Sequence, residues 1–161
     1  MTPARFNPAP APQRPPLPAV IRGFVGIPFA DKGFSFDGCH CYGLCWLVFL
    51  RAADITLPKY DLISSAETIA IARAMKDEAK SGRWRRLRAD ETPRAFDMAE
   101  MIEIPRPGAR AWHCGIVAGP GRLLHCERGV GSHLADLADP RIAPRVVGFH
   151  RHVALEGRTD G

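Results

Sequence analysis

Cysteine and histidine often supply the nucleophiles, bases and metal ligands of proteins, and in this chain they gather in two short segments. The first segment holds Cys39, Cys41 and Cys45, and the second contains the pairs His113-Cys114 and His125-Cys126. A thiolate is a strong nucleophile, but it needs a base within hydrogen-bonding reach and a third group that orients the base. The two segments together therefore hold the residue types of a cysteine-dependent catalytic site.

Cys41 lies at the start of a mostly apolar run. Residues 40–53 contain one glycine, and the run is long enough to form a buried helix. At a helix N-terminus, unpaired backbone N–H groups and the helix dipole stabilise a thiolate and lower its pKa. The same N–H groups can stabilise the oxyanion of an acyl-transfer reaction. Cys41 is therefore the predicted nucleophile.

The two histidines lie on either side of a predicted turn. Two stretches rich in β-forming residues, 111–118 and 122–127, flank a Gly-Pro-Gly sequence and predict a hairpin. With those three residues as the loop, His125 pairs with Gly115, and His113 and His125 lie on one face as diagonal neighbours about 7–8 Å apart at the backbone. This arrangement suits a base and its orienting group. A loop of two or four residues would put the rings on opposite faces.

Two other interpretations of the same residues remain open. A metal site could draw on the cysteines and histidines together, but structural zinc sites usually space their ligands in pairs on a turn. We therefore predict no metal ion and no cofactor. Free cysteine is also among the most buried residue types and often only fills space. We expect this packing role for Cys45, Cys114 and Cys126.

The chain length and composition indicate one folded domain. At 161 residues, a single domain buries roughly 70% of the surface of its unfolded chain. Residues 1–19 are rich in Pro and Ala and predict a flexible, extended arm. Residues 20–155 form the predicted domain, and residues 156–161 a flexible tail.

Helical signals precede strand signals along the domain. Ser64 and Glu67 have the spacing of a capping box, and Gly82 marks the end of the helix that they open. We expect its buried face to consist of Ile69, Ala72, Met75 and Ala79. Strands are predicted at 96–104 and 145–153 besides the hairpin. Helices followed by strands favour an α+β fold with an antiparallel sheet.

Charge and composition narrow the function classes. The hydrophobic content of 46% excludes a wholly disordered chain, and no apolar run approaches the roughly 18 residues that span a bilayer. The net charge of +5 suits an anionic envelope or an acidic partner. The basic run at residues 83–88 could bind the phosphates and bases of a nucleic acid. Such runs are more often solvated or subunit-contacting edges, so we predict no nucleic-acid partner.

Four short segments, in this order, resemble the NlpC family of cell-wall cysteine endopeptidases. Residues 26–29, Gly-Ile-Pro-Phe, resemble the family's Gly-x-Pro-Tyr motif, which precedes the nucleophile. Residues 38–44 resemble its Asp-Cys-x-Gly-Leu nucleophile motif. Residues 113–116 resemble its His-Val-Gly-Ile strand, and residues 124–126 resemble the strand that follows. The resemblance covers roughly residues 22–152.

The resemblance implies a papain-like α+β fold in which helices pack on an antiparallel sheet and the nucleophile starts a helix. It implies that Cys41 is the nucleophile, His113 the base and His125 the orienting group. The implied activity is cleavage of an amide in the peptide stem of bacterial peptidoglycan, typically between D-glutamate and a diamino acid.

The resemblance also implies a substrate-binding role for Phe29, His40 and Tyr42. Two of these residues depart from the family pattern, because His40 replaces the usual Asp and Phe29 replaces the usual Tyr. Loss of a buried hydrogen-bond donor can cost about 1–3 kcal/mol, which is roughly 10- to 100-fold in rate. A cationic His40 could raise the nucleophilicity of Cys41, but it cannot accept a substrate amine as a carboxylate would.

A segment after the first helix resembles the phage-tail branch of the family. Residues 57–60, Leu-Pro-Lys-Tyr, and the compact length carry this similarity. Because no signal peptide is visible, we expect synthesis in the bacterial cytoplasm and transport in a virion tail to the cell wall. The predicted partners are the stem peptide and other tail-tip proteins, which residues 1–19 could contact. The alternative is a structural tail-tip subunit with little or no activity.

Overall fold

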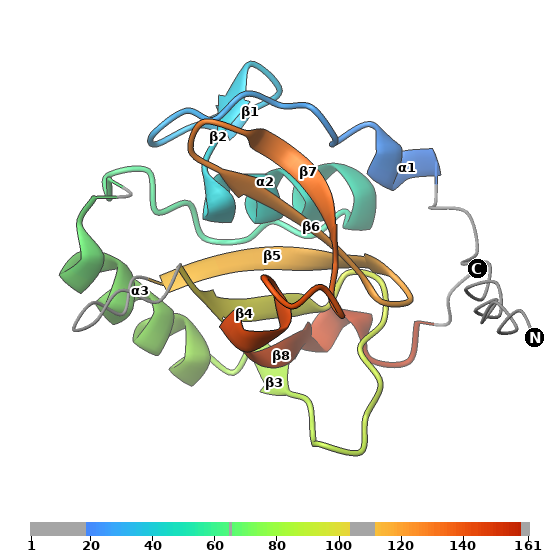
Figure 1. Ribbon diagram of the computed structural model, residues 1–161. Coiled ribbons are helices and arrows are strands. Elements are labelled where there is room, and N and C mark those ends of the chain that lie inside the picture. Colours follow the sequence, from blue (N-terminus) through green and yellow to red (C-terminus); the bar gives the residue numbers. More distant parts are fainter. Residues whose placement is uncertain (1–18, 65, 104–111, 159–161) are drawn as a thin grey trace, which may run out of the picture.

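The computed structural model describes residues 19–64, 66–103 and 112–158 (Figure 1). In these ranges an N-terminal helical part packs on an antiparallel sheet, so the chain has the predicted α+β architecture. No helix within the three ranges is long and apolar enough to cross a bilayer. The boundaries of the arm and the tail stay predictions, since residues 1–18 and 159–161 lie outside the described ranges.

The elements follow one another in a simple order. The helical elements are α1 (Ala19–Arg22), α2 (Cys41–Val48), the π-helical turn η1 (Phe49–Ala53), α3 (Thr68–Lys80), and the 3-10 turns η2 (Ala143–Arg145) and η3 (Val153–Leu155). The strands are β1 (Phe34–Ser35), β2 (Gly38–Cys39), β3 (Trp84–Arg86), β4 (Met98–Ile102), β5 (Trp112–Gly119), β6 (Arg122–Glu127), β7 (Gly131–Asp136) and β8 (Val146–His152).

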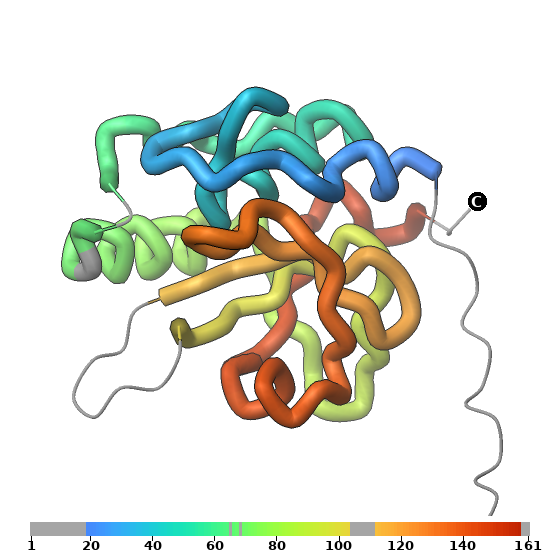
Figure 2. The backbone as a smooth tube through the Cα atoms, turned by 45° about the horizontal axis from the view of Figure 1, so that its top comes forward, coloured from blue at the N-terminus to red at the C-terminus, as the bar shows by residue number. Residues whose placement is uncertain are grey.

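The main sheet positions the helix that carries Cys41. It has six antiparallel strands in the order β3-β8-β4-β5-β6-β7, and β1 and β2 form a separate pair. The helix α2 lies along β5, while α3 lies near one end of β5 (Figures 1 and 2). Alternate residues of β5 and β6, such as Ile116 and Leu124, pack with Leu44 and Val48 of α2 in the main core. Residues of the opposite face join a smaller core with Ile142.

The helix over residues 40–53 begins where the sequence predicts it and changes character before its end. His40 is the N-cap, and its Nδ1 accepts a hydrogen bond from the Gly43 N–H at 3.0 Å. A Cβ on Gly43 would come within 1.9 Å of the Gly33 carbonyl oxygen, so glycine permits the close approach of the β1 loop. The last turn is π-helical and ends at Asp54 in the left-handed region.

The β5–β6 hairpin has the predicted register at its histidines but reaches it through a different turn. His125 pairs with Gly115, as predicted. The loop contains only two residues, Pro120 and Gly121, and a register shift leaves Ala118 unpaired. One extra residue in a bulge compensates for one fewer in the loop. The two-residue loop therefore does not put the histidines on opposite faces, so the prediction for a loop of this length is wrong.

The start of α3 differs from the prediction. The Ser64 N–H donates to Glu67 Oε2 at 2.6 Å, which is one half of a capping box. The Ser64 hydroxyl, however, donates to Asp31 Oδ2 at 2.6 Å. This contact ties Ser64 to the N-terminal segment, and the helix begins only at Thr68.

The buried face of α3 also differs. Ile69 is 73% exposed and Ala79 is exposed, whereas Ala72 and Met75 are half-buried. The helix instead turns Glu78 inward, where three donors from other segments reach its carboxylate. These donors are Tyr60 Oη at 2.9 Å, Arg83 Nη2 at 2.7 Å and Trp84 Nε1 at 2.8 Å.

Two strands of the main sheet, β3 and β7, were not predicted, nor was the short pair of β1 and β2. The strand β3 coincides with part of the basic run and forms an edge of the sheet, where Trp84 pairs with His152. Its arginines make ion pairs with Glu91, Glu100 and Glu156. Charged edge strands resist further strand pairing, so this basic segment has a structural role in the sheet.

A buried ion pair between Asp97 and Arg151 is expected to be a large stabilising contact. The Arg151 Nε and Nη2 donate to the Asp97 carboxylate at 2.8 and 2.7 Å. The variant Asp97→Ala leaves the arginine charge buried without its partner, so we expect a loss of about 3–5 kcal/mol. Urea unfolding followed by circular dichroism measures this loss of unfolding free energy.

The matched control is Asp90→Ala, which breaks an exposed ion pair with Arg88 and should cost less than about 1 kcal/mol. Equal losses in the two variants would contradict the expectation.

Candidate active site

Cys41 is the first residue of α2, and its side chain is half-buried. The positive end of the helix dipole therefore lies beside the thiol. The turn that precedes Cys41 is stabilised by two contacts. His40 caps the helix, and β1 pairs with β2, where Phe34 lies opposite Cys39.

His113 and His125 come from adjacent strands and form a direct hydrogen-bonded pair. His113 Nε2 and His125 Nδ1 are 2.9 Å apart, and the two rings are tilted by 77°. His113 is 4% exposed and His125 is fully buried. Because Nε2 of His113 faces His125, Nδ1 is the nitrogen available to Cys41. The structure thus brings together the three residues that the sequence nominates.

The thiol of Cys41 is not acidic in this arrangement, contrary to the expectation from its helix position. Hydrogen bonding to Cys114 and burial raise its pKa to about 11, although hydrogen bonds with His113 and His40 act in the opposite direction. At neutral pH Cys41 is therefore a neutral thiol. A nucleophilic role for this thiol would require transfer of its proton to a neighbouring base during attack, as in serine enzymes.

His125 is held neutral. Burial and the neighbouring His113 lower the pKa of His125 to about 3. A neutral His125 can accept a hydrogen bond from the Nε2–H of His113 without taking its proton. This arrangement would allow His113 to keep a proton received from Cys41 and to pass it to a leaving group.

Glu127 completes the polar group behind the histidines, and sequence reasoning missed it. Its Oε1 lies 3.9 Å from His125 Nδ1 and accepts from Arg145 Nη1 at 2.8 Å, and its Oε2 lies 3.4 Å from His133 Nε2. The ligand atoms of His113, His125 and Glu127 fall within 4.8 Å of one another, a spacing that a metal ion could bridge. The facing nitrogens of the two histidines hydrogen-bond each other and Glu127 accepts from Arg145, so we assign these atoms to hydrogen bonding. The Nε2 of His125 is buried and has no partner among the described residues.

The three predicted substrate-binding residues do not share one cavity. His40 and Tyr42 line a cavity of about 210 Å³ together with Cys41, whereas Phe29 does not line it. Phe29 is half-buried beneath Arg128, whose guanidinium lies 4.7 Å from the ring centroid. The Tyr42 hydroxyl donates to the Pro58 carbonyl at 2.6 Å, so this phenol is engaged within the protein.

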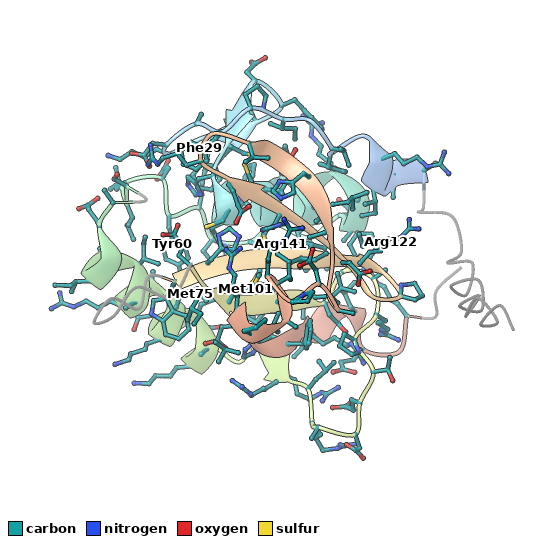
Figure 3. The ribbon with its side chains drawn as sticks, viewed as in Figure 1. Phe29, Tyr60, Met75, Met101, Arg122 and Arg141 are labelled. Atoms are coloured by element: carbon teal, nitrogen blue, oxygen red, sulfur yellow. The ribbon has the colours of Figure 1, made fainter. Side chains whose placement is uncertain are left out.

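The cavity lies between α3 and the sheet, next to the thiol. Tyr60 and Met75, labelled in Figure 3, line it together with Trp84 and Trp112. Glu100 and Glu103 add carboxylates to a mainly apolar wall, and Glu100 accepts from His150 at 2.8 Å. Sequence analysis did not nominate these residues, because they come from segments far apart in the chain.

Lowering the pH is expected to destabilise the fold through His125. Folded His125 has a pKa of about 3, whereas an unfolded chain protonates histidine near pH 6.5. Between these values the unfolded state binds more protons, so stability falls as the pH is lowered. We expect the parent chain to lose about 2 kcal/mol more than His125→Asn between pH 7 and pH 5. Urea unfolding at both pH values measures this, and identical losses would contradict it.

Two solved structures are similar to this chain over most of its length. One is a lipoprotein-like protein of the NLP/P60 family from Staphylococcus aureus subsp. aureus Mu50, with a TM-score of 0.57 and 20% identity over 83% of this chain and 40% of that one. The other is an NlpC/P60 family protein from Bacillus cereus ATCC 10987, with a TM-score of 0.56 and 19% identity over 85% of this chain and 41% of that one. The chain has the NlpC/P60 fold.

The NlpC/P60 fold confirms the papain-like architecture that the four sequence segments indicate. The chain spans about two fifths of the length of the two similar proteins. The NlpC/p60 domain of the peptidoglycan hydrolase SagA aligns less well, with a TM-score of 0.48 and 14% identity over 82% of this chain and 94% of that one. No protein-family model matches the sequence, and no curated protein matches it significantly.

Proposed function

We propose that the chain is a thiol endopeptidase that cleaves an amide bond in the peptide stem of bacterial peptidoglycan. The observation that supports this most directly is the group of Cys41, His113 and His125 at the start of α2, with 2.9 Å between the two imidazoles. The NlpC/P60 fold and the sequence resemblance to cell-wall endopeptidases point to the same chemistry.

In the proposed reaction Cys41 attacks the carbonyl carbon of the scissile amide. His113 takes the thiol proton through Nδ1 and gives it to the departing amine, which leaves an acyl-enzyme for water to hydrolyse. His125 holds the His113 ring and accepts from its Nε2–H. Backbone N–H groups at the start of α2 stabilise the oxyanion.

The cavity beside Cys41 fits the proposed substrate. Its aromatic and aliphatic walls suit the carbon chain of a diamino acid, and the carboxylate of Glu103 suits the amine at its end. Glu100 is already paired with His150 and Arg86. The net charge of +5 favours association with an anionic cell wall.

We further propose that a phage tail or tail-like particle carries the enzyme to the wall. The sequence similarity of residues 57–60 to the phage-tail branch supports this. The same segment packs on α2, because Trp46 Nε1 donates to the Leu57 carbonyl at 2.9 Å. Residues 1–19 would contact neighbouring tail proteins.

Two observations favour a second candidate function, a tail-tip subunit with little activity. The pKa of Cys41 is raised to about 11, and Phe29 and His40 depart from the family pattern. In that case particles that carry Cys41→Ala would assemble and infect normally, whereas deletion of residues 1–18 would block assembly.

Digestion of purified peptidoglycan tests the proposed function. The protein should release fragments with a new amino terminus on the diamino acid, which mass spectrometry identifies. Release of sugar reducing ends instead, or no release under reducing conditions, would overturn the proposal.

A further inference from the structure

Three of the five cysteines form a continuous group of thiols at the nucleophile. Cys41 and Cys45 lie one turn apart on α2, and both face β5. The Cys45 thiol donates to the Cys114 sulfur at 3.7 Å. Cys114 also lies close enough to Cys41 to be the main influence that raises the pKa of the Cys41 thiol. Cys114 therefore contacts both of the other thiols.

The three thiols differ in their access to solvent. Cys45 is fully buried and Cys114 is 2% exposed, whereas Cys41 is half-buried and lines the cavity. A small oxidant that enters the cavity meets Cys41 first. Oxidation can then pass inward, because Cys114 lies next to Cys41 and Cys45 lies next to Cys114.

We propose that Cys45 and Cys114 are a resolving dithiol that takes over the oxidation of Cys41 and returns it to the thiol. The proposal rests on the proposed function only for the role of Cys41 as nucleophile. Its product is a buried disulfide between α2 and β5.

The sulfur chemistry balances with a peroxide as the oxidant. The Cys41 thiolate attacks the peroxide, the O–O bond breaks, and a sulfenic acid and hydroxide form. The Cys114 thiolate attacks the sulfenic sulfur, so an S–S bond forms and a second hydroxide leaves. The Cys45 thiolate then attacks Cys114, and Cys41 leaves as a thiolate. Overall two thiols lose two electrons to the peroxide, and two waters form once the released protons are counted.

The arrangement requires only local movement for the last bond. The Cys45 and Cys114 sulfurs must close from 3.7 Å to about 2 Å, within elements that already pack together. The other two cysteines form a second pair, because the Cys126 thiol donates to the Cys39 carbonyl oxygen at 3.2 Å and the two side chains also interact with each other. Cys126 therefore serves as a control thiol outside the group at Cys41.

The disulfide has a consequence for Cys41. The hydrogen bond that the Cys41 thiol donates to Cys114 is the largest influence that raises the pKa of Cys41. A Cys45–Cys114 disulfide weakens this interaction, because a disulfide sulfur is a poorer acceptor than a thiolate. More thiolate then forms at neutral pH, although a less basic thiolate is a weaker nucleophile. We expect a net gain of about tenfold in the alkylation rate of Cys41 at pH 7.

Mass spectrometry of the folded chain tests the proposal without peptidoglycan. The reduced protein receives one equivalent of hydrogen peroxide, free thiols are blocked with N-ethylmaleimide, and the disulfides are mapped. We expect a Cys45–Cys114 disulfide with Cys41 free. The Cys45→Ala variant should stop at a Cys41–Cys114 disulfide that dithiothreitol reverses, and Cys114→Ala should accumulate sulfinic acid at Cys41. The control variant Cys126→Ala should behave as the parent chain.

Two results would overturn the proposal. One is a parent chain that stops at the Cys41–Cys114 disulfide. The other is over-oxidation of Cys41 while Cys45 and Cys114 remain thiols. Because the experiment reads the oxidation state of each sulfur, a chain that fails to digest peptidoglycan can still confirm or refute the transfer of oxidation from Cys41 to Cys45 and Cys114.

Discussion

Replacing Cys41 with Ala should abolish stem-peptide cleavage while leaving the fold intact. Loss of an enzymatic nucleophile typically costs about 10⁵- to 10⁶-fold in rate. The side chain is half-buried at the first position of α2, and Ala has high helix propensity, so little stability should be lost. The measurement is the initial rate of release of new amino termini from peptidoglycan in the presence of dithiothreitol.

The matched control is Cys45→Ala, one turn further along the same helix. Under reducing conditions it should digest peptidoglycan at a rate close to that of the parent chain, because Cys45 contacts Cys114 and not the histidines. Circular dichroism checks that both variants fold. Digestion by Cys41→Ala at the parental rate would refute the assignment of the nucleophile.

Local sequence signals were sufficient to predict the elements that carry the site. An apolar run of helical length placed Cys41 at a helix start, and alternation around a turn placed His113 and His125 on one face. The register at His125 agrees with the structure although the loop is shorter than expected, because the bulge at Ala118 restores the alternation. Burial of the inner hairpin face selects that alternation more strongly than the turn sequence does.

The unpredicted features depend on contacts between distant segments. Glu78 points inward because Tyr60, Arg83 and Trp84 converge on it, and amphipathic periodicity does not contain that information. The edge strand β3 has the composition of a solvated run, since its arginines pair with carboxylates on other segments.

The protonation state of Cys41 also depends on a contact between distant segments. Its helix position alone favours a thiolate. The packing of α2 on β5 brings Cys114 beside the sulfur, and this contact together with burial has the larger effect on the pKa. Cys114 occupies the position after His113, where the family motif has Val. The sequence therefore contains the residue responsible, but only the structure places it next to Cys41.

Replacing His125 with Ala should reduce turnover about 10³- to 10⁴-fold, which is the size of effect known for the orienting member of a catalytic triad. His113 must present Nδ1 to the thiol, and the 2.9 Å contact with His125 selects that orientation. His125→Asn can supply an acceptor oxygen to the Nε2–H of His113, so we expect it to retain more activity than the Ala variant.

A third variant separates orientation from packing, because His125 is fully buried and its loss also leaves a cavity. His125→Leu fills much of the space but offers no acceptor, so it should lose as much turnover as His125→Ala while regaining stability. Recovery of parental activity by His125→Leu would mean that His125 only fills space and that His113 is oriented by other contacts.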